Sequence, residues 1–155
     1  MLKGAKMERH YEDMQVGEEY ESPARTITET DIVNFSAISG DWSPVHSDEE
    51  YCKHSPYKTR IAHGLLGLAI SEGLKFRIPE FANARYMASL YWNYKFTGPI
   101  LMGDTIRVRV KVLSKRETKK PDRGIVVEYV TMLNQREEIV QEGEHGSMVL
   151  RKGVA

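Results

Sequence analysis

The chain has 155 residues, of which 41% are hydrophobic and 28% charged, and its 22 Lys and Arg residues balance 22 Asp and Glu residues. This length suits one domain over residues 1–155, and the absence of a basic excess argues against a nucleic-acid partner, because such proteins neutralise phosphates with clustered positive charge. A lone cysteine, no apolar signal segment in residues 1–14 and no apolar run long enough to cross a bilayer together predict a cytoplasmic protein without disulfides and without a membrane partner.

The first predicted elements in chain order are a short strand and a helix. Residues 18–27 predict a strand at the amino-terminal end of a sheet. Thr28 is suited to cap a helix, with Asp31 at the third helical position and Gly40 just past the last turn. We expect an apolar stripe on this helix, made of Ile32, Phe35 and Ile38.

Two further helices are predicted before residue 77. Residues 47–50 (SDEE) have the form of a capping box, which predicts a short helix from Asp48 through Cys52. Residues 62–76 are apolar around most of the helix axis, so we expect this helix to be buried. A glycine lowers helix propensity by roughly 1 kcal/mol relative to alanine. That cost suggests close approach of another backbone or a ligand at Gly64, Gly67 and Gly73, although Gly67 and Gly73 could equally be small residues that pack against the sheet.

The second half of the chain alternates apolar and polar residues, which is typical of strands. Strands separated by short turns are predicted at 85–96, 106–112, 125–133, 138–141 and 145–152. Short turns imply antiparallel pairing, and the apolar face of such a sheet needs a cover. The sequence therefore predicts an α+β fold in which an antiparallel sheet wraps around the long central helix at 62–76.

The loop at residues 40–46 (GDWSPVH) contains two residues suited to proton transfer, Asp41 and His46. Pro44 prevents the loop from continuing a helix, so a turn is needed to bring the two side chains together. His46 directly precedes the next predicted helix, whose positive end favours a neutral imidazole, whereas the acidic residues that follow favour the charged form.

The residues of this loop leave several interpretations open. Asp41 and His46 could be structural, or they could form a proton-transfer pair. A metal site is less favoured because the histidines lack the paired spacings of zinc motifs, and a serine hydrolase is less favoured because no G-x-S-x-G sequence occurs.

Residues 60–66 (RIAHGLL) open the central helix. The free N–H of Gly64 at the helix amino end could donate to a carbonyl oxygen that gains negative charge, as in an oxyanion hole. His63 is more readily interpreted as a helix-start residue bonded to nearby backbone than as a catalytic group.

Residues 35–46 (FSAISGDWSPVH) closely resemble the signature of the MaoC-like, (R)-specific enoyl-CoA hydratases, a family with the hot-dog fold. Residues 60–66, and Phe96-x-x-Pro99 followed by Gly-Asp-Thr at 103–105, agree with this resemblance, which runs from about residue 11 to residue 151. One departure is Ser43, where the family usually has Asn, because Ser lacks the reach and the second polar group of the amide.

The resemblance implies a function and a site. Asp41 and His46 would be the catalytic pair and the Gly64 N–H the oxyanion donor, with substrate contacts from Ser43, Pro44, His63 and Leu65. The implied reaction is hydration of a trans-2-enoyl-CoA to a (3R)-3-hydroxyacyl-CoA, or the reverse dehydration. The dyad would hold and deprotonate water, and one of its members would deliver the proton to the α-carbon.

The resemblance also bears on cofactors and partners. We expect no metal and no separate cofactor, since coenzyme A is part of the acyl-CoA substrate, and we expect a homodimer or a higher homo-oligomer. Two alternatives stay open, a hot-dog acyl-CoA thioesterase and a non-catalytic acyl-CoA or acyl-carrier binding module. Candidate phosphate contacts, chosen by charge alone, are Lys115, Arg116, Lys119 and Lys120.

Overall fold

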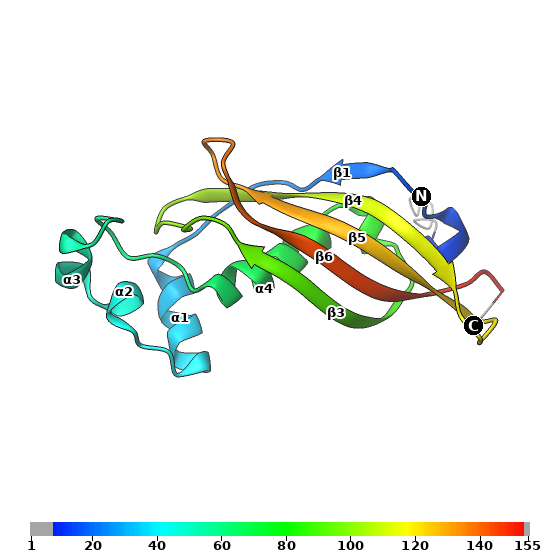
Figure 1. Cartoon of the computed structure of the whole chain (residues 1–155), viewed down its shortest axis with the longest axis horizontal. Coiled ribbons are helices and arrows are strands. Elements are labelled where there is room, and N and C mark those ends of the chain that lie inside the picture. Colours follow the sequence, from blue (N-terminus) through cyan, green and yellow to red (C-terminus); the bar gives the residue numbers. More distant parts are fainter. Residues whose placement is uncertain (1–7, 154–155) are drawn as a thin grey trace, which may run out of the picture.

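The computed structural model describes residues 8–153, so the two ends of the predicted 1–155 domain lie outside it. Within this range a six-stranded antiparallel sheet has the order β1-β4-β5-β6-β3, with β2 paired to β4 (Figure 1). The strands are β1 (Glu19–Glu21), β2 (Arg25–Thr26), β3 (Tyr86–Phe96), β4 (Thr105–Glu117), β5 (Arg123–Leu133) and β6 (Ile139–Leu150). β3 therefore forms one edge of the sheet.

The helix α4 (Gly64–Lys75) packs against one face of this sheet (Figure 1). Its buried residues Leu66, Ile70 and Leu74 belong to the same apolar core as the inward-facing valines of β4. Those valines alternate with charged residues on the outer face of β4, as the sequence period requires. The predicted α+β architecture, an antiparallel sheet wrapped around a central helix, is confirmed.

The prediction that this helix is buried all round is wrong on one face. Leu65 is 60% exposed, and Ala69, Gly73 and Phe76 are exposed on the same side. Residues that recur every three to four positions share one helix face. An apolar stripe of α4 therefore points away from the sheet, and no atom of residues 8–153 outside this helix lies within 4 Å of a Cβ built on Gly73.

Two predicted strand assignments also need correction. The segments 138–141 and 145–152 form one continuous strand, β6, rather than two. Its polar and glycine residues interrupt the apolar alternation from which strands are predicted. Gly143 is required at its position, because a side chain there would collide with Asn93 O on β3. Conversely, the predicted strand at 18–27 is two short strands, β1 and β2.

Three helices form a lobe beside the start of α4 (Figure 1): α1 (Glu29–Ser39), α2 (Pro44–Ser47) and α3 (Glu49–His54). Thr28 caps α1 together with Asp31, as predicted. Ile38 was expected on the apolar stripe but is 84% exposed.

The remaining short helices are η1 (Tyr11–Asp13) and α5 (Pro79–Ala82). The predicted capping box at 47–50 is wrong, because Asp48 caps α3 by accepting from the Tyr51 N–H, while Ser47 Oγ donates to Trp42 O. Across residues 8–153, no helix is both long enough and apolar enough to cross a membrane.

Candidate active site

Asp41 lies in the loop between α1 and α2, where local hydrogen bonds hold its carboxylate. Gly40 ends α1 in the left-handed conformation (φ 77°), which glycine adopts without strain. Asp41 Oδ1 accepts hydrogen bonds from Ser43 Oγ (2.5 Å) and from the Ser43 N–H (3.1 Å). These bonds from Ser43 hold the pKa of Asp41 below its usual range. A carboxylate is therefore available at neutral pH, with Oδ2 left free of these bonds.

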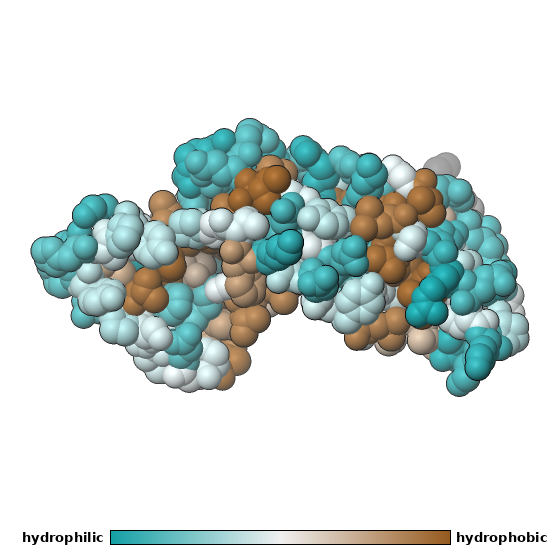
Figure 2. All heavy atoms as spheres, in the orientation of Figure 1, coloured by the Kyte–Doolittle hydropathy of each residue, from teal (hydrophilic) through white to brown (hydrophobic). Residues whose placement is uncertain are grey.

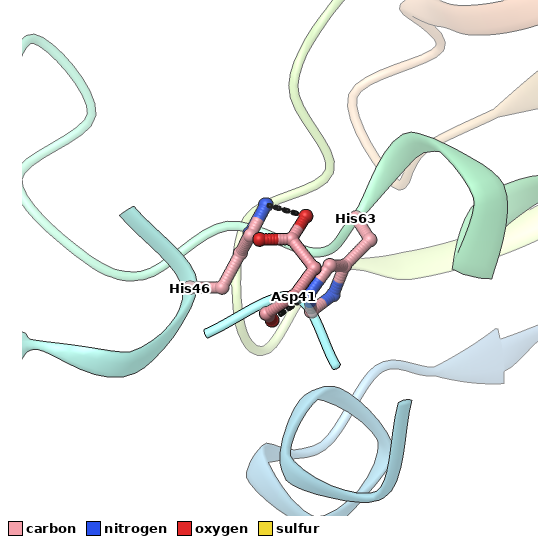
Figure 3. A group of neighbouring side chains, drawn as sticks. All are labelled: Asp41, His46 and His63. Atoms are coloured by element: carbon pink, nitrogen blue, oxygen red, sulfur yellow. Dashed lines mark hydrogen bonds and ion pairs between the residues drawn. The ribbon is translucent and has the colours of Figure 1, made fainter. Parts of the chain in front are cut away.

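His46 faces Asp41 from α2. Its Nδ1 donates to Ile61 O (2.8 Å), so the neutral ring carries its lone pair on Nε2, 3.9 Å from Asp41 Oδ2 (Figure 3). The sequence placed His46 before the positive end of a helix, and this is wrong, because Pro44 starts the short helix α2 and His46 lies in its last turn. The orientation of the ring comes from the Ile61 carbonyl instead.

His63 supports both members of this pair (Figure 3). Its ring stacks on that of His46 with centroids 3.7 Å apart, and its Nε2 donates to Asp41 O (3.0 Å). Ser36 Oγ of α1 lies 3.3 Å from the same nitrogen. His63 is thus bonded to backbone at the start of α4, as the residues alone suggested.

Gly64 is the first residue of α4, and its N–H makes no hydrogen bond with any residue in the range 8–153. A Cβ at this position would lie 2.9 Å from the ring of Phe96, so only glycine fits without a shift of that ring. The free amide is therefore a donor at the amino end of a helix, where a developing negative charge is stabilised.

Two cavities meet at His46, Gly64 and Phe96. One, of about 370 Å³, is also lined by Asp41, His63 and Leu65. The other, of about 400 Å³, extends towards the β3–β4 connection; its further lining includes Tyr57, Pro99, Ile100 and Gln141. The catalytic atoms predicted from the sequence therefore share one hollow that is large enough for part of a substrate.

The predicted substrate contacts divide into two groups. His63 and Leu65 line the first cavity, whereas Ser43 and Pro44 line neither cavity. Ser43 acts on Asp41, and Pro44 begins α2. The candidate phosphate contacts at 115–120 lie around the β4–β5 turn, at the opposite end of the sheet from α1–α3, so within this chain they do not reach the loop (Figure 1).

Asp41, His46 and His63 also bring one potential metal ligand each to within 4.8 Å of one another. An imidazole binds an ion along the lone pair in its ring plane. The two rings stack with their planes 24° apart, an arrangement in which both rings do not readily turn an in-plane lone pair towards one ion. In addition, His63 Nε2 already donates to Asp41 O. This geometry suits proton transfer better than metal binding.

Sequence reasoning missed two contributors to the site. Phe35 of α1 packs against His63 with ring centroids 4.9 Å apart, and Gln141 of β6 donates from Nε2 to Gly64 O (3.0 Å). The glycine at position 67 signalled a close neighbour of the helix, but the sequence could not say that the neighbour is Gln141.

Comparison with known proteins places this site in a family. A family model described as a MaoC like domain matches residues 13–132. The (R)-specific enoyl-CoA hydratase of Rhodospirillum rubrum is 35% identical over 145 residues, which cover 93% of this chain and 94% of that protein. The 3-hydroxybutyryl-CoA dehydratase of Methylorubrum extorquens is 37% identical over 105 residues, 66% of this chain and 63% of that protein.

A solved structure agrees with these sequence matches. The crystal structure of the MaoC-like dehydratase from Rhodospirillum rubrum superposes with a TM-score of 0.80 and 27% identity, and the match covers 94% of this chain and 99% of that one. The family-model match includes the loop that carries Asp41 and His46, the helix α4 and the strands from β1 through most of β5. This chain belongs to the MaoC-like family of hot-dog proteins.

Proposed function

We propose that this protein catalyses the (R)-specific hydration of trans-2-enoyl-CoA thioesters to (3R)-3-hydroxyacyl-CoA, or the reverse dehydration. The observation that carries the proposal is the pair Asp41 Oδ2 and His46 Nε2, 3.9 Å apart, in a cavity that also includes Gly64. The names of two relatives, a hydratase and a dehydratase, support it.

The spacing of the pair suits one water molecule. An ionised Asp41 and a neutral His46 both present hydrogen-bond acceptors to the space between them. A water oxygen about 2.8 Å from each atom would see them at an angle of roughly 90°, close to the angle between its two O–H bonds. Asp41 and His46 can therefore hold a water by both protons and leave an oxygen lone pair facing the substrate.

The chemistry of a conjugated thioester assigns the remaining roles. The water oxygen bonds to the β-carbon while one dyad member takes its proton, and the electron pair of the double bond moves towards the thioester oxygen. The Gly64 N–H donates to that oxygen, and an interaction of this kind typically contributes about 10²- to 10³-fold in rate. A dyad member then delivers a proton to the α-carbon on the same face, which restores the thioester carbonyl.

Ser43 keeps this arrangement despite replacing the usual Asn of the family. Both its N–H and its Oγ bond Asp41 Oδ1, so the orientation of the carboxylate does not depend on an amide side chain at this position. This observation favours a catalytic site over a binding module.

The exposed apolar surface suits the homodimer implied by the family resemblance. Apolar side chains are exposed along α4 and the edge strand β3, among them Leu65, Phe76, Met87 and Leu90. Figure 2 shows brown apolar atoms on this side, where the molecule is hollowed between the lobe and the sheet. An unpaired edge beside an apolar helix face would be covered if two sheets joined through β3. The acyl chain would then lie along α4. The cytoplasmic location of the protein stays a prediction.

The test is loss of the conjugated-thioester absorbance when purified protein meets a panel of trans-2-enoyl-CoAs, followed by chiral analysis of the product. We expect the (3R) alcohol from the wild-type protein, and a loss of about 10³-fold or more in Asp41→Asn and His46→Ala. Matched controls are Asp48→Asn, which keeps a good helix cap, and His54→Ala on the exposed face of α3; both should retain activity.

The outcomes separate the alternatives. Release of free thiol instead of hydroxyacyl-CoA would indicate a thioesterase. Tight binding of enoyl-CoA with neither turnover nor thiol release, in a protein that is folded, would indicate a binding module and contradict the proposal.

A further inference from the structure

Gln141 is a buried amide beside the start of α4, and its side-chain oxygen has no hydrogen-bond partner. The residue is 1% exposed. Its Nε2 donates to Gly64 O (3.0 Å), so Oε1 points elsewhere, and no donor among residues 8–153 reaches it. A buried acceptor without a donor is unfavourable, and a bound molecule that brings a donor would relieve this cost.

The fold makes room for this amide at two glycines of α4. A Cβ on Gly67 would collide with the amide group of Gln141, and Gly64 supplies the carbonyl that the amide binds. Gln141 also pairs across the strands with Phe96, whose ring lies against Gly64. Glycine lowers helix propensity, so the start of α4 is less stable than an alanine-rich helix would be. In exchange, the two glycines leave space for a polar side chain.

This amide lies at a cavity that the proposed substrate would enter. Gln141 lines the cavity of about 400 Å³ that also includes His46 and Gly64. Tyr57 and Phe96 on the same cavity are exposed whereas Gln141 is buried, so Gln141 marks its inner end. The coenzyme A part of an acyl thioester has to lead out to solvent, and the acyl group is therefore the part that reaches the inner end.

The other polar side chains on this cavity are engaged elsewhere or lie at its mouth. Thr97 Oγ1 donates to Ile139 O (2.9 Å) and His46 Nδ1 donates to Ile61 O (2.8 Å), while Tyr57 is exposed at the mouth of the cavity. Most of the remaining lining is apolar or glycine. A polar atom deep in such a lining can discriminate between substrates, because a site built to bind a hydroxyl disfavours an analogue that lacks it.

Building on the proposed function, we infer that Gln141 is a specificity-determining residue whose Oε1 accepts a hydrogen bond from a hydroxyl group on the acyl chain of the substrate. The protein would thus prefer hydroxylated enoyl-CoAs to unsubstituted ones of equal length.

The experiment compares kcat/KM for two trans-2-enoyl-CoAs of matched chain length, one unsubstituted and one with a hydroxyl beyond the double bond, across positional isomers. In the wild-type protein the best hydroxylated isomer should be favoured. Gln141→Leu should lower the ratio of hydroxylated to unsubstituted kcat/KM by about 10-fold. Gln141→Glu should preserve the ratio, because burial favours the protonated carboxyl, which donates to Gly64 O and keeps a free carbonyl oxygen. Gln15→Leu, an exposed glutamine, is the matched control.

The ratio separates substrate recognition from support of the helix. If Gln141→Leu lowers both substrates equally, the residue merely buttresses Gly64 and the inference is wrong. If the wild-type protein turns over neither substrate, the proposed function fails first. Dissociation constants for the saturated hydroxylated and unsubstituted acyl-CoAs then test Gln141 alone, and equal values in the wild-type protein would overturn its role. Thermal unfolding of each variant establishes that it is folded.

Discussion

The two ends of α4 each hold a cluster of titratable side chains with a stacked histidine, yet one cluster is open and the other is sealed. At the amino end, His46 stacks on His63 and faces Asp41, whose side chain is 47% exposed. At the carboxyl end, His145 stacks on Trp92 with ring centroids 4.0 Å apart, and Lys75 beside it has no exposed surface.

The sealed cluster satisfies its charges internally. Lys75 Nζ donates to Glu128 Oε2 (2.8 Å) and to His145 Nδ1 (3.0 Å), and the opposite nitrogen of His145 donates to Ser89 Oγ (2.7 Å). Tyr86 donates its hydroxyl proton to the other oxygen of Glu128. These bonds compensate the cost of removing the charges from water.

The difference lies in which atoms are left without partners. In the open cluster, Asp41 Oδ1 accepts from Ser43 and His46 Nδ1 donates to Ile61 O. The other atom of each side chain, Asp41 Oδ2 and His46 Nε2, faces its counterpart across a gap of 3.9 Å. In the sealed cluster, both oxygens of Glu128 and both ring nitrogens of His145 are bonded to protein, and Glu72 Oε2, which has no hydrogen bond within residues 8–153, lies 3.5 Å from the ammonium of Lys75. A buried ionic network whose hydrogen bonds are formed therefore stabilises the fold. A similar set of residues that leaves two acceptors without a donor beside a cavity is instead a candidate catalytic site.

The largest effect on stability is expected from a substitution at Lys75 in the sealed cluster. Replacement Lys75→Met leaves Glu128 buried without its cation, which typically costs about 3 to 5 kcal/mol and would lower Tm by roughly 10 °C or more. Lys53→Met on the exposed face of α3 is the control and should change Tm little. A Lys75→Met protein as stable as the wild type would show that the sealed cluster contributes nothing to the fold.

A second contrast compares two glycines of the same helix. In Gly64→Ala the new methyl would lie 2.9 Å from the Phe96 ring, beside the free N–H, and we expect kcat to fall by about 10²-fold. In Gly73→Ala the methyl meets open space, so activity should persist and the free energy of unfolding should rise by up to about 1 kcal/mol. Steady-state kinetics and denaturant unfolding measure both, and equal losses of activity would contradict the proposed oxyanion role of Gly64.

The sealed cluster also predicts how stability depends on pH. Burial alone would raise the pKa of Glu128, but its contacts with His145, Lys75 and Tyr86 outweigh burial and hold the pKa below its usual value. The unfolded state therefore binds a proton at higher pH than the folded state does, and the stabilisation is present above about pH 4.3 and is lost as the pH falls through the folded pKa.

This contribution is measurable as a slope. Within the window, one titrating carboxyl changes the free energy of unfolding by at most about 1.4 kcal/mol per pH unit. Glu128→Gln should flatten the acid side of the stability curve by part of that slope, although it lowers stability at neutral pH. Glu50→Gln, a carboxyl on α3 whose side chain is 78% exposed, is the control; an identical acid slope in Glu128→Gln and the wild type would refute the assignment.

The open site was predictable from sequence because its parts are close along the chain. The glycine that ends α1, the proline that starts α2, and the pair Asp41 and His46 fall within residues 40–46, so local turn chemistry brings them together. The sealed cluster was not predictable, since Lys75, Glu128 and His145 come from three separate elements and their pairing appears only when the sheet closes over α4. The same reason explains why the sequence predicts two strands where the structure has the single strand β6. The inward-facing polar residues of β6 bind partners on other elements, so they do not follow the local apolar alternation that identifies a strand.

The smallest expected effect concerns Ser43 and tests how the open site keeps Asp41 charged. Ser43→Ala removes the hydrogen bond from Oγ but keeps the one from the backbone N–H, so kcat/KM should fall only about 3- to 10-fold. Because the Oγ bond is the largest cause of the lowered pKa of Asp41, that pKa should rise in the variant. The proposed reaction needs the ionised carboxylate, so the acid limit of the activity profile should move to higher pH. Ser43→Asn, the usual family residue, can donate from its amide and should stay close to the wild type in both readouts. An unchanged acid limit in Ser43→Ala would mean that the charge on Asp41 does not depend on Ser43.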